Sequence, residues 1–223
     1  MTLKDTLSID LITNFKEDSI LVDKILDLTR ASYVTNTELI AREIEHNSDI
    51  YTVSNDEGEL LAFFMVNFEE VAGKETFYLG LSACRDELKG QGLGKSLYLR
   101  FLTDCKEREL ATQKKYLLWW TTGTPIVYYW FNKYVSKVQP DMNGNFDSYG
   151  ESIAHTIRAA KFPNIAADPH PFILRSVAQN TSYSFTEQVR LLAATQALGL
   201  NVFEKFEVRE ENADRFLMFG YTY

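Results

Sequence analysis

The stretch Gly90-Gln91-Gly92-Leu93-Gly94-Lys95-Ser96 decides how this sequence is interpreted. It lies between an apolar segment, Phe77 to Ala83, that is typical of a strand and an amphipathic segment, Lys95 to Leu110, that is typical of a helix. A strand, a glycine-rich turn and a helix N-terminus direct several backbone N–H groups at one point, where the helix dipole adds positive charge. Glycine lets a phosphate group approach this backbone closely. The stretch therefore predicts a loop that binds a phosphate-bearing ligand.

Two common phosphate motifs do not fit this spacing. A Walker A loop that ends at Gly94-Lys95-Ser96 would need its first glycine at position 89, which is Lys89. A dinucleotide-binding G-x-G-x-x-G pattern would need glycine at position 95, which is Lys95. A nucleotide-binding protein with a shortened loop remains the weaker alternative.

The run Lys89-Gly90-Gln91-Gly92-Leu93-Gly94 resembles the pyrophosphate loop, Q/R-x-x-G-x-G/A, of the GCN5-related N-acetyltransferase (GNAT) superfamily. Lys89 stands where the superfamily usually has Arg or Gln, which keeps a positive charge but loses the planar fork. The resemblance implies that this loop and the helix start hold the diphosphate of acetyl-CoA. The residues so implied are Lys89, Gly90, Gln91, Gly92, Leu93, Gly94, Lys95 and Ser96. An ordinary tight turn is the alternative reading of the glycines alone.

Hydrophobic periodicity and turn residues predict the elements along the chain. The order over residues 5 to 138 matches the superfamily's mixed α+β fold, in which helices flank a central, mostly antiparallel twisted sheet that is splayed at the CoA site. We expect one domain over residues 1–223, in which 139–200 is a helical and loop elaboration on the acceptor side. The expected strands are 9–12, 50–54, 60–68, 75–83 and 115–121, with a final hairpin of 202–208 and 215–223. The expected helices are 19–33, 37–45, 95–110, 126–135, 148–162 and 185–198.

Composition limits the classes of partner. A net charge of −8 over 223 residues argues against nucleic acid or an anionic membrane as the main partner. No apolar run is long enough to span a membrane, and the N-terminal residues Met1 to Asp5 lack the apolar core of a signal peptide, so a cytoplasmic location is expected. Cys84 and Cys105 are expected to be buried, reduced thiols, and the three histidines show no metal-ligand spacing, so no metal is expected. Arg85, Lys89 and Lys95 supply a local basic patch.

The resemblance also implies roles in acetyl transfer. Backbone N–H groups near the strand end, at Leu81, Ser82 and Ala83, would stabilise the oxyanion. A tyrosine on the helix after the buried strand would protonate the departing thiolate, and alignment on Thr124-Pro125-Ile126-Val127 favours Tyr128. Core packing of an aromatic stripe is the competing interpretation of Tyr128.

Glu75 is the candidate general base. In the histone-acetylating branch of the superfamily a glutamate occupies a similar place, in a stretch that resembles Glu75 to Ser82. Strand alternation puts Glu75 on the face shared by Phe77, Leu79 and Leu81. A solvated carboxylate at the strand end is the competing interpretation of Glu75. Glu69, Glu70 and His170 are weaker candidates for the base, and ordered water is a further route for the proton.

The sequence thus predicts an N-acetyltransferase that moves acetyl from acetyl-CoA to a primary amine of a small molecule or peptide. Direct attack without a covalent intermediate is favoured, because neither Cys84 nor Cys105 has a recognisable histidine partner. The acidic net charge favours a cationic acceptor. A non-catalytic acyl-CoA-binding sensor module is the main alternative. The C-terminal hairpin is a candidate pairing edge for a homodimer.

Overall fold

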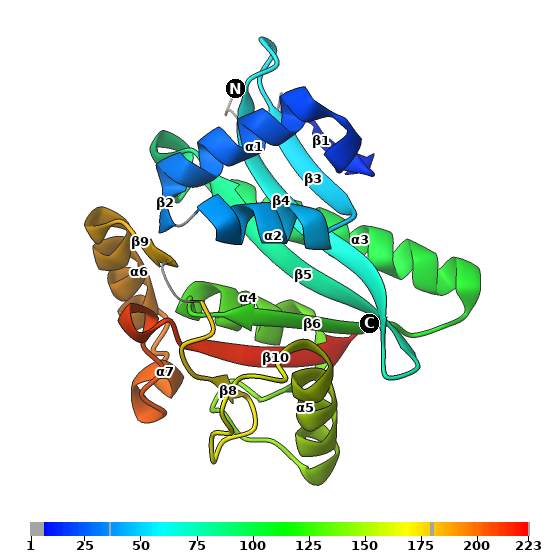
Figure 1. Cartoon of the computed structure of the whole chain (residues 1–223), viewed down its shortest axis with the longest axis vertical. Coiled ribbons are helices and arrows are strands. Elements are labelled where there is room, and N and C mark those ends of the chain that lie inside the picture. The colour runs from blue at the N-terminus through cyan, green and yellow to red at the C-terminus, as the bar shows by residue number, and fades with distance from the viewer. Residues whose placement is uncertain (1–6, 36, 179–180, 223) are drawn as a thin grey trace. The chain divides into compact units, whose positions relative to one another are not determined.

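The computed structural model describes residues 7–35, 37–178 and 181–222 (Figure 1). The chain divides into two compact units, the first made of residues 1–68 and 79–112 and the second of residues 69–78 and 113–223. No helix in the described ranges is long and apolar enough to cross a membrane. The expectation of a single domain over 1–223 stays a prediction.

The first unit contains a sheet with the order β1–β3–β4–β5. β1 and β3 are antiparallel, with Ile12 opposite Ile50, and β3 and β4 are antiparallel, with Ile50 opposite Met65. The turn between β3 and β4 closes with the N–H of Gly58 donating to the carbonyl of Asn55 at 2.9 Å, and Gly58 has a φ of +75°. This is the predicted Asn-Asp-Glu-Gly hairpin. The bounds are β1 (Ile9–Thr13), β3 (Asp49–Ser54), β4 (Leu60–Val71) and β5 (Lys74–Cys84).

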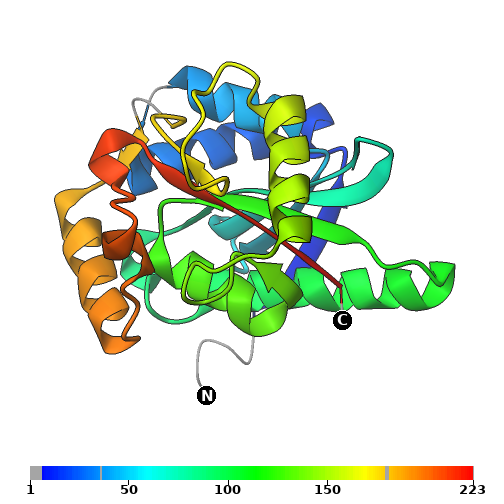
Figure 2. The same ribbon diagram turned by 90° about the horizontal axis from the view of Figure 1, so that it is seen from below.

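Three long helices cover this sheet. Figures 1 and 2 show α1 and α2 on one of its faces and α3 on the other. The sequence pattern allows Asp18 or Ser19 as the cap of α1, and the Asp18 side chain is the one that caps it, by accepting a hydrogen bond from the N–H of Leu21 at 3.0 Å. The helices are α1 (Ser19–Ser32), α2 (Thr37–His46) and α3 (Leu93–Thr112), and short elements are η2 (Phe15–Glu17), β2 (Tyr33–Thr35) and η3 (Asp86–Leu88).

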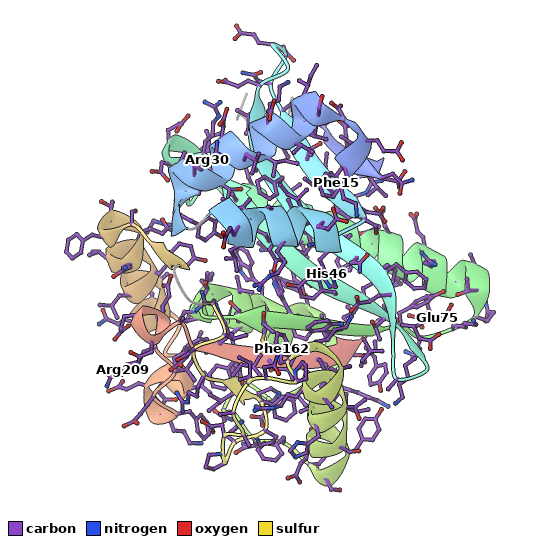
Figure 3. The ribbon with its side chains drawn as sticks, in the orientation of Figure 1. Phe15, Arg30, His46, Glu75, Phe162 and Arg209 are labelled. Carbon is purple, nitrogen blue, oxygen red and sulfur yellow. The ribbon has the colours of Figure 1, made fainter. Side chains whose placement is uncertain are left out.

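Both faces of the sheet are packed with apolar side chains. The α1 and α2 side carries a buried cluster that includes Phe15, which Figure 3 labels, together with Phe63 and Met65 of β4. On the opposite face, Phe64 makes edge-on ring contacts with Tyr98 and Phe101 of α3. The predicted apolar face of α3 is confirmed, with Leu97, Tyr98, Phe101 and Cys105 buried.

The second unit is organised around β10. This strand pairs antiparallel with β6, with Met218 opposite Trp120, and also with β7 and β8. Figures 1 and 2 show α4 and α5 on opposite faces of this part of the sheet. The strands are β6 (Leu117–Thr122), β7 (Ser136–Gln139), β8 (Ile173–Leu174), β9 (Thr181–Tyr183) and β10 (Arg215–Tyr221). The helices are α4 (Pro125–Tyr134), α5 (Ser148–Lys161), α6 (Phe185–Ala197), α7 (Val202–Lys205) and η4 (Glu210–Asn212).

The predicted C-terminal hairpin is wrong in its first strand. Val202 begins the short helix α7, where the N–H of Phe206 donates to the carbonyl of Val202 at 3.1 Å. Val202 and the adjacent Phe203 are both buried, whereas a half-buried strand alternates. Phe203 packs against the rings of Tyr128 and Phe216, so tertiary contacts outweigh the strand preference of this apolar run. The neighbours of β10 are instead β6, β7 and β8, and β7 was not predicted.

His170 lies among aromatic rings in the second unit. Its Nε2 is 3.1 Å from the carbonyl oxygen of Gly144, and its Nδ1 accepts the N–H of Phe172 at 3.3 Å. The rings of Phe146 and Phe206 have centroids 5.0 and 4.5 Å away. Burial lowers the pKa of His170 below its ordinary value of 6.5, so the folded protein favours the neutral ring.

We therefore expect acid to destabilise the second unit in a way that depends on His170. Because the folded pKa lies below 6.5, the stabilising contribution is complete above pH 6.5 and is lost as the pH falls through the folded pKa. Urea midpoints measured at pH 7.5 and at successively lower pH should fall less in His170→Asn than in the unchanged protein. Identical slopes in the two proteins would contradict this assignment.

Candidate functional site

The glycine loop lies within the first unit, between β5 and α3. The chain leaves β5 at Cys84, forms the single turn of η3 and enters α3 at Leu93. Gly90 and Gly92 have φ values of +83° and +88°, which side-chain-bearing residues adopt rarely. The N–H of Ser96 donates to the carbonyl of Gly92 at 2.9 Å, which places Gly92 at the N-cap of α3. The predicted order of strand, glycine turn and helix N-terminus is confirmed.

The backbone amides available to a ligand are fewer than the sequence implied. The N–H of Gln91 donates to the carbonyl of Leu88 at 3.2 Å, and the N–H of Ser96 is the first helical amide with an acceptor inside α3. The first amides of any α-helix have no intrahelical acceptor. The amides suited to hold an anion are therefore those of Leu93, Gly94 and Lys95, at the positive end of the helix dipole.

Two of the three predicted basic residues are engaged by carboxylates. Arg85 lies 2.5 Å from Glu59, and its Nε donates to the carbonyl of Leu60 at 3.1 Å. Lys89 lies 2.5 Å from Asp86, and its side chain is only 13% exposed. A diphosphate at this loop would consequently depend more on backbone amides and the helix dipole than on a basic patch.

The side chain of Gln91 turns back toward η3. Its Nε2 donates to the carbonyl of Glu87 at 3.1 Å. Positions 90, 92 and 94 are glycine, and the side-chain amide of Gln91 is bound to η3. The loop can therefore hold a diphosphate group through its backbone N–H groups.

The end of β5 holds the residues expected beside the thioester. Leu81 and Ser82 are half-buried, and Ala83 is buried. The N–H of Arg85 donates to the carbonyl of Leu61 in β4 at 2.9 Å, so strand alternation points the carbonyls of Ser82 and Cys84 to the edge away from β4.

Hydroxyl groups from the end of α1 meet that edge. The Oη of Tyr33 donates to the carbonyl of Ser82 at 2.6 Å, and the Oγ of Ser32 donates to the carbonyl of Cys84 at 3.1 Å. The sequence analysis missed both residues, because they lie about fifty positions before their partners and belong to no motif.

Tyr128 lies in the second unit and is fully buried. Its hydroxyl donates to the carbonyl of Asp141, and its ring packs against Phe203 and Phe216. Burial, followed by the charge of Asp141, raises the pKa of Tyr128. The role of Tyr128 as the acid stays a prediction, and this geometry favours the competing interpretation of core packing.

Glu75 lies at the start of β5, in the part of the strand that belongs to the second unit (Figure 3). Its carboxylate is 44% exposed and lies 2.8 Å from the Nζ of Lys114. The role of Glu75 as the base stays a prediction, and the ion pair favours the solvated strand-end alternative.

A groove of about 460 Å³ opens beside η3 in the first unit. It is bounded by α1, the start of β4 and η3, and no single stretch of sequence predicts it. Its walls include the carboxylates of Asp27, Glu59 and Glu87 and the cations of Lys24 and Arg85.

Among the described residues, no group of three His, Cys, Asp or Glu side chains is arranged to hold a metal ion.

No protein-family model and no curated protein matches this sequence. Solved structures of acetyltransferases, one of them described as a GNAT family N-acetyltransferase, are similar to this chain. The YhbS protein of Escherichia coli in complex with CoA is 20% identical, with 56% of this chain and 67% of that chain covered and a TM-score of 0.44. An IAA acetyltransferase of Bacillus cereus is 14% identical over 97% of this chain and 99% of that chain, with a TM-score of 0.44. The ribosomal-protein-S18-alanine N-acetyltransferase of E. coli is 11% identical over 97% and 94%, with a TM-score of 0.46.

With TM-scores below 0.5 these matches do not carry a functional assignment, which depends on the geometry of the loop. The mixed α+β class with a mostly antiparallel sheet is confirmed within each unit. The parting of strands at the coenzyme site concerns the placement of the two units and stays a prediction.

Proposed function

We propose that this protein is an N-acetyltransferase that moves acetyl from acetyl-CoA to a primary amine. The observation that supports it most is the loop between β5 and α3. Gly90 and Gly92, at φ +83° and +88°, lead directly into the N-terminus of a 20-residue helix. That arrangement suits a diphosphate, and CoA carries one.

The proposed chemistry is a direct displacement. The amine nitrogen attacks the thioester carbonyl carbon, a C–N bond forms and the C–S bond breaks. The amine nitrogen loses one proton and the departing CoA sulfur gains one, so the products are an amide and free CoA thiol. Holding both reactants in place supplies much of the rate enhancement, and N–H groups near Leu81, Ser82 and Ala83 are proposed to stabilise the oxyanion.

The state of Cys105 supports direct attack over a covalent intermediate. Cys105 is 3% exposed, and burial raises the pKa of its thiol, so the nucleophilic thiolate is scarce at neutral pH. Cys84 is half-buried and donates its S–H to the carbonyl of Arg85 at 3.5 Å. Both cysteines are free, which suits a reducing compartment such as the cytoplasm.

The acceptor is proposed to be a small molecule or peptide with a cationic amine. A net charge of −8 attracts such a molecule, and a protonated amine must lose its proton before it attacks. Glu75 and Tyr128 remain the proposed base and acid from the superfamily resemblance.

Calorimetry with CoA and a thiol-release assay over a panel of amines test the proposal together. We expect CoA to bind and at least one primary amine to release thiol from acetyl-CoA. Tight CoA binding with no thiol release from any amine would favour the sensor module. Displacement of CoA by ATP would favour a nucleotide-binding protein instead.

A further inference from the structure

The hydroxyl of Tyr33 is an acidic group of the first unit that contacts the proposed thioester strand, β5. Its Oη is 2.6 Å from the carbonyl oxygen of Ser82, and the Tyr33 side chain is half-buried. The neighbouring Ser32 donates to the carbonyl of Cys84 at 3.1 Å, so the end of α1 is held on β5 by two hydrogen bonds. These contacts lie entirely within one unit.

The proposed reaction needs a proton donor at this place. A thiolate leaves more easily when a positioned acid protonates it, and such catalysis contributes about 10²–10⁴-fold. Tyr128 is poorly suited, because it is 0% exposed, whereas Tyr33 is half-buried. The Tyr33 hydroxyl lies at the carbonyl of Ser82, on the strand against which the thioester is proposed to lie.

We propose that Tyr33 is the general acid that protonates the departing CoA sulfur. As the C–S bond breaks, its electron pair goes to sulfur, which takes the phenolic proton of Tyr33. The tyrosinate then regains a proton from solvent, which has received one from the amine nitrogen. This inference rests on the proposed function, since it places CoA against β5.

The first test measures binding chemistry and needs no turnover. A hydroxyl that donates to the sulfur of bound CoA stabilises its thiolate, and hydrogen bonds to charged groups correspond to a pKa shift of about one unit or more. Titrating the ultraviolet absorbance of bound CoA thiolate should give a pKa at least about one unit higher in Tyr33→Phe than in the unchanged protein. Ser32→Ala is the matched control, because it removes the neighbouring hydroxyl-to-carbonyl bond and should leave this pKa unchanged.

The second test uses the leaving group. Tyr33→Phe should lower kcat for acetyl-CoA by about 100-fold. The loss should shrink to a few-fold with the acetyl selenoester of CoA, because a selenolate is a weaker base and leaves without protonation. A purely structural role for Tyr33 would reduce both rates equally. Ser32→Ala should reduce neither selectively.

The outcomes separate this inference from the proposed function. An active protein in which Tyr33→Phe keeps the same CoA thiol pKa, or loses equally with both donors, overturns the role of Tyr33 and leaves acetyl transfer standing. Failure of the unchanged protein to bind CoA overturns both. A CoA thiol pKa that depends on Tyr33 supports the inference even if no amine on the panel is acetylated.

Discussion

Replacing Gly92 with valine is expected to weaken CoA binding by at least about 100-fold, equivalent to about 2.8 kcal/mol. Gly92 has a φ of +88° at the N-cap of α3, and a β-branched residue there costs about 1–3 kcal/mol in backbone strain. Relief of that strain would reorient the amides of Leu93, Gly94 and Lys95. The new side chain would also occupy the space over which a diphosphate must lie. Calorimetric titration of CoA measures the change directly.

Gly73→Val is the matched control for backbone strain. Gly73 has a φ of +77° in the turn between β4 and β5, and nothing lies within 4 Å of where its Cβ would stand. Both variants should lower thermal stability to a similar degree, but only Gly92→Val should lose CoA. Equal CoA affinity in the two variants would contradict the assignment of the loop.

The side chain of Gln91 provides a second comparison. Its amide nitrogen donates to the carbonyl of Glu87, and the proposed grip on the diphosphate depends on backbone atoms. Gln91→Ala should therefore change CoA affinity by less than about 3-fold, within about 0.7 kcal/mol. A large loss would mean that Gln91 itself contacts the ligand.

The loop could be predicted from sequence because its signals are local. Glycine at positions 90 and 92 indicates a positive φ at each. The hydrophobic periodicity on either side of the loop indicates a strand and a helix. The Asn55 to Gly58 hairpin was predicted for the same reason, and the cap of α1 was narrowed to Asp18 or the adjacent Ser19. Each depends on residues within a few positions of one another.

Features that depend on distant residues escaped prediction. Arg85 is held by Glu59, twenty-six positions earlier, so the expected basic patch is largely neutralised. Tyr33 reaches Ser82 across 49 positions, and no motif links them. The prediction of a strand from Val202 was wrong for another reason. A short apolar segment fits either a strand or a buried helix until its packing partners are known.

Aromatic residues illustrate the same limit at the candidate site. Tyr128, Tyr129 and Tyr134 share one helix, and the sequence offered no way to tell which ring is buried. Tyr128 is buried against Phe216 of β10, and this tertiary contact depends on where β10 lies in the fold.

Arg158 is expected to be the most sensitive charged residue of the second unit. Its guanidinium donates to the carbonyls of Pro171, Ile173 and Ala166 at 3.2, 2.6 and 2.9 Å, and the residue is only 8% exposed. Burial lowers the pKa of Arg158, yet a guanidinium stays protonated at neutral pH and retains all its donors. One α5 side chain therefore ties the loop after α5 to the start of β8.

Arg158→Met should lower the free energy of unfolding of the second unit by about 3–5 kcal/mol, because two buried carbonyls and one partly buried carbonyl lose their donor. Methionine is also a long, unbranched side chain, so the loss of stability measures the missing hydrogen bonds more than a change in side-chain volume. Amide hydrogen exchange should accelerate more over residues 163–174 than in β6, because the loop loses its hydrogen bonds to Arg158 while the sheet keeps its backbone hydrogen bonds. Arg209→Met, at a side chain that is 60% exposed, should change stability by less than about 0.5 kcal/mol. Equal effects of the two substitutions would show that the hydrogen bonds of Arg158 do not stabilise the second unit. CoA binding to the loop of the first unit should persist in both variants.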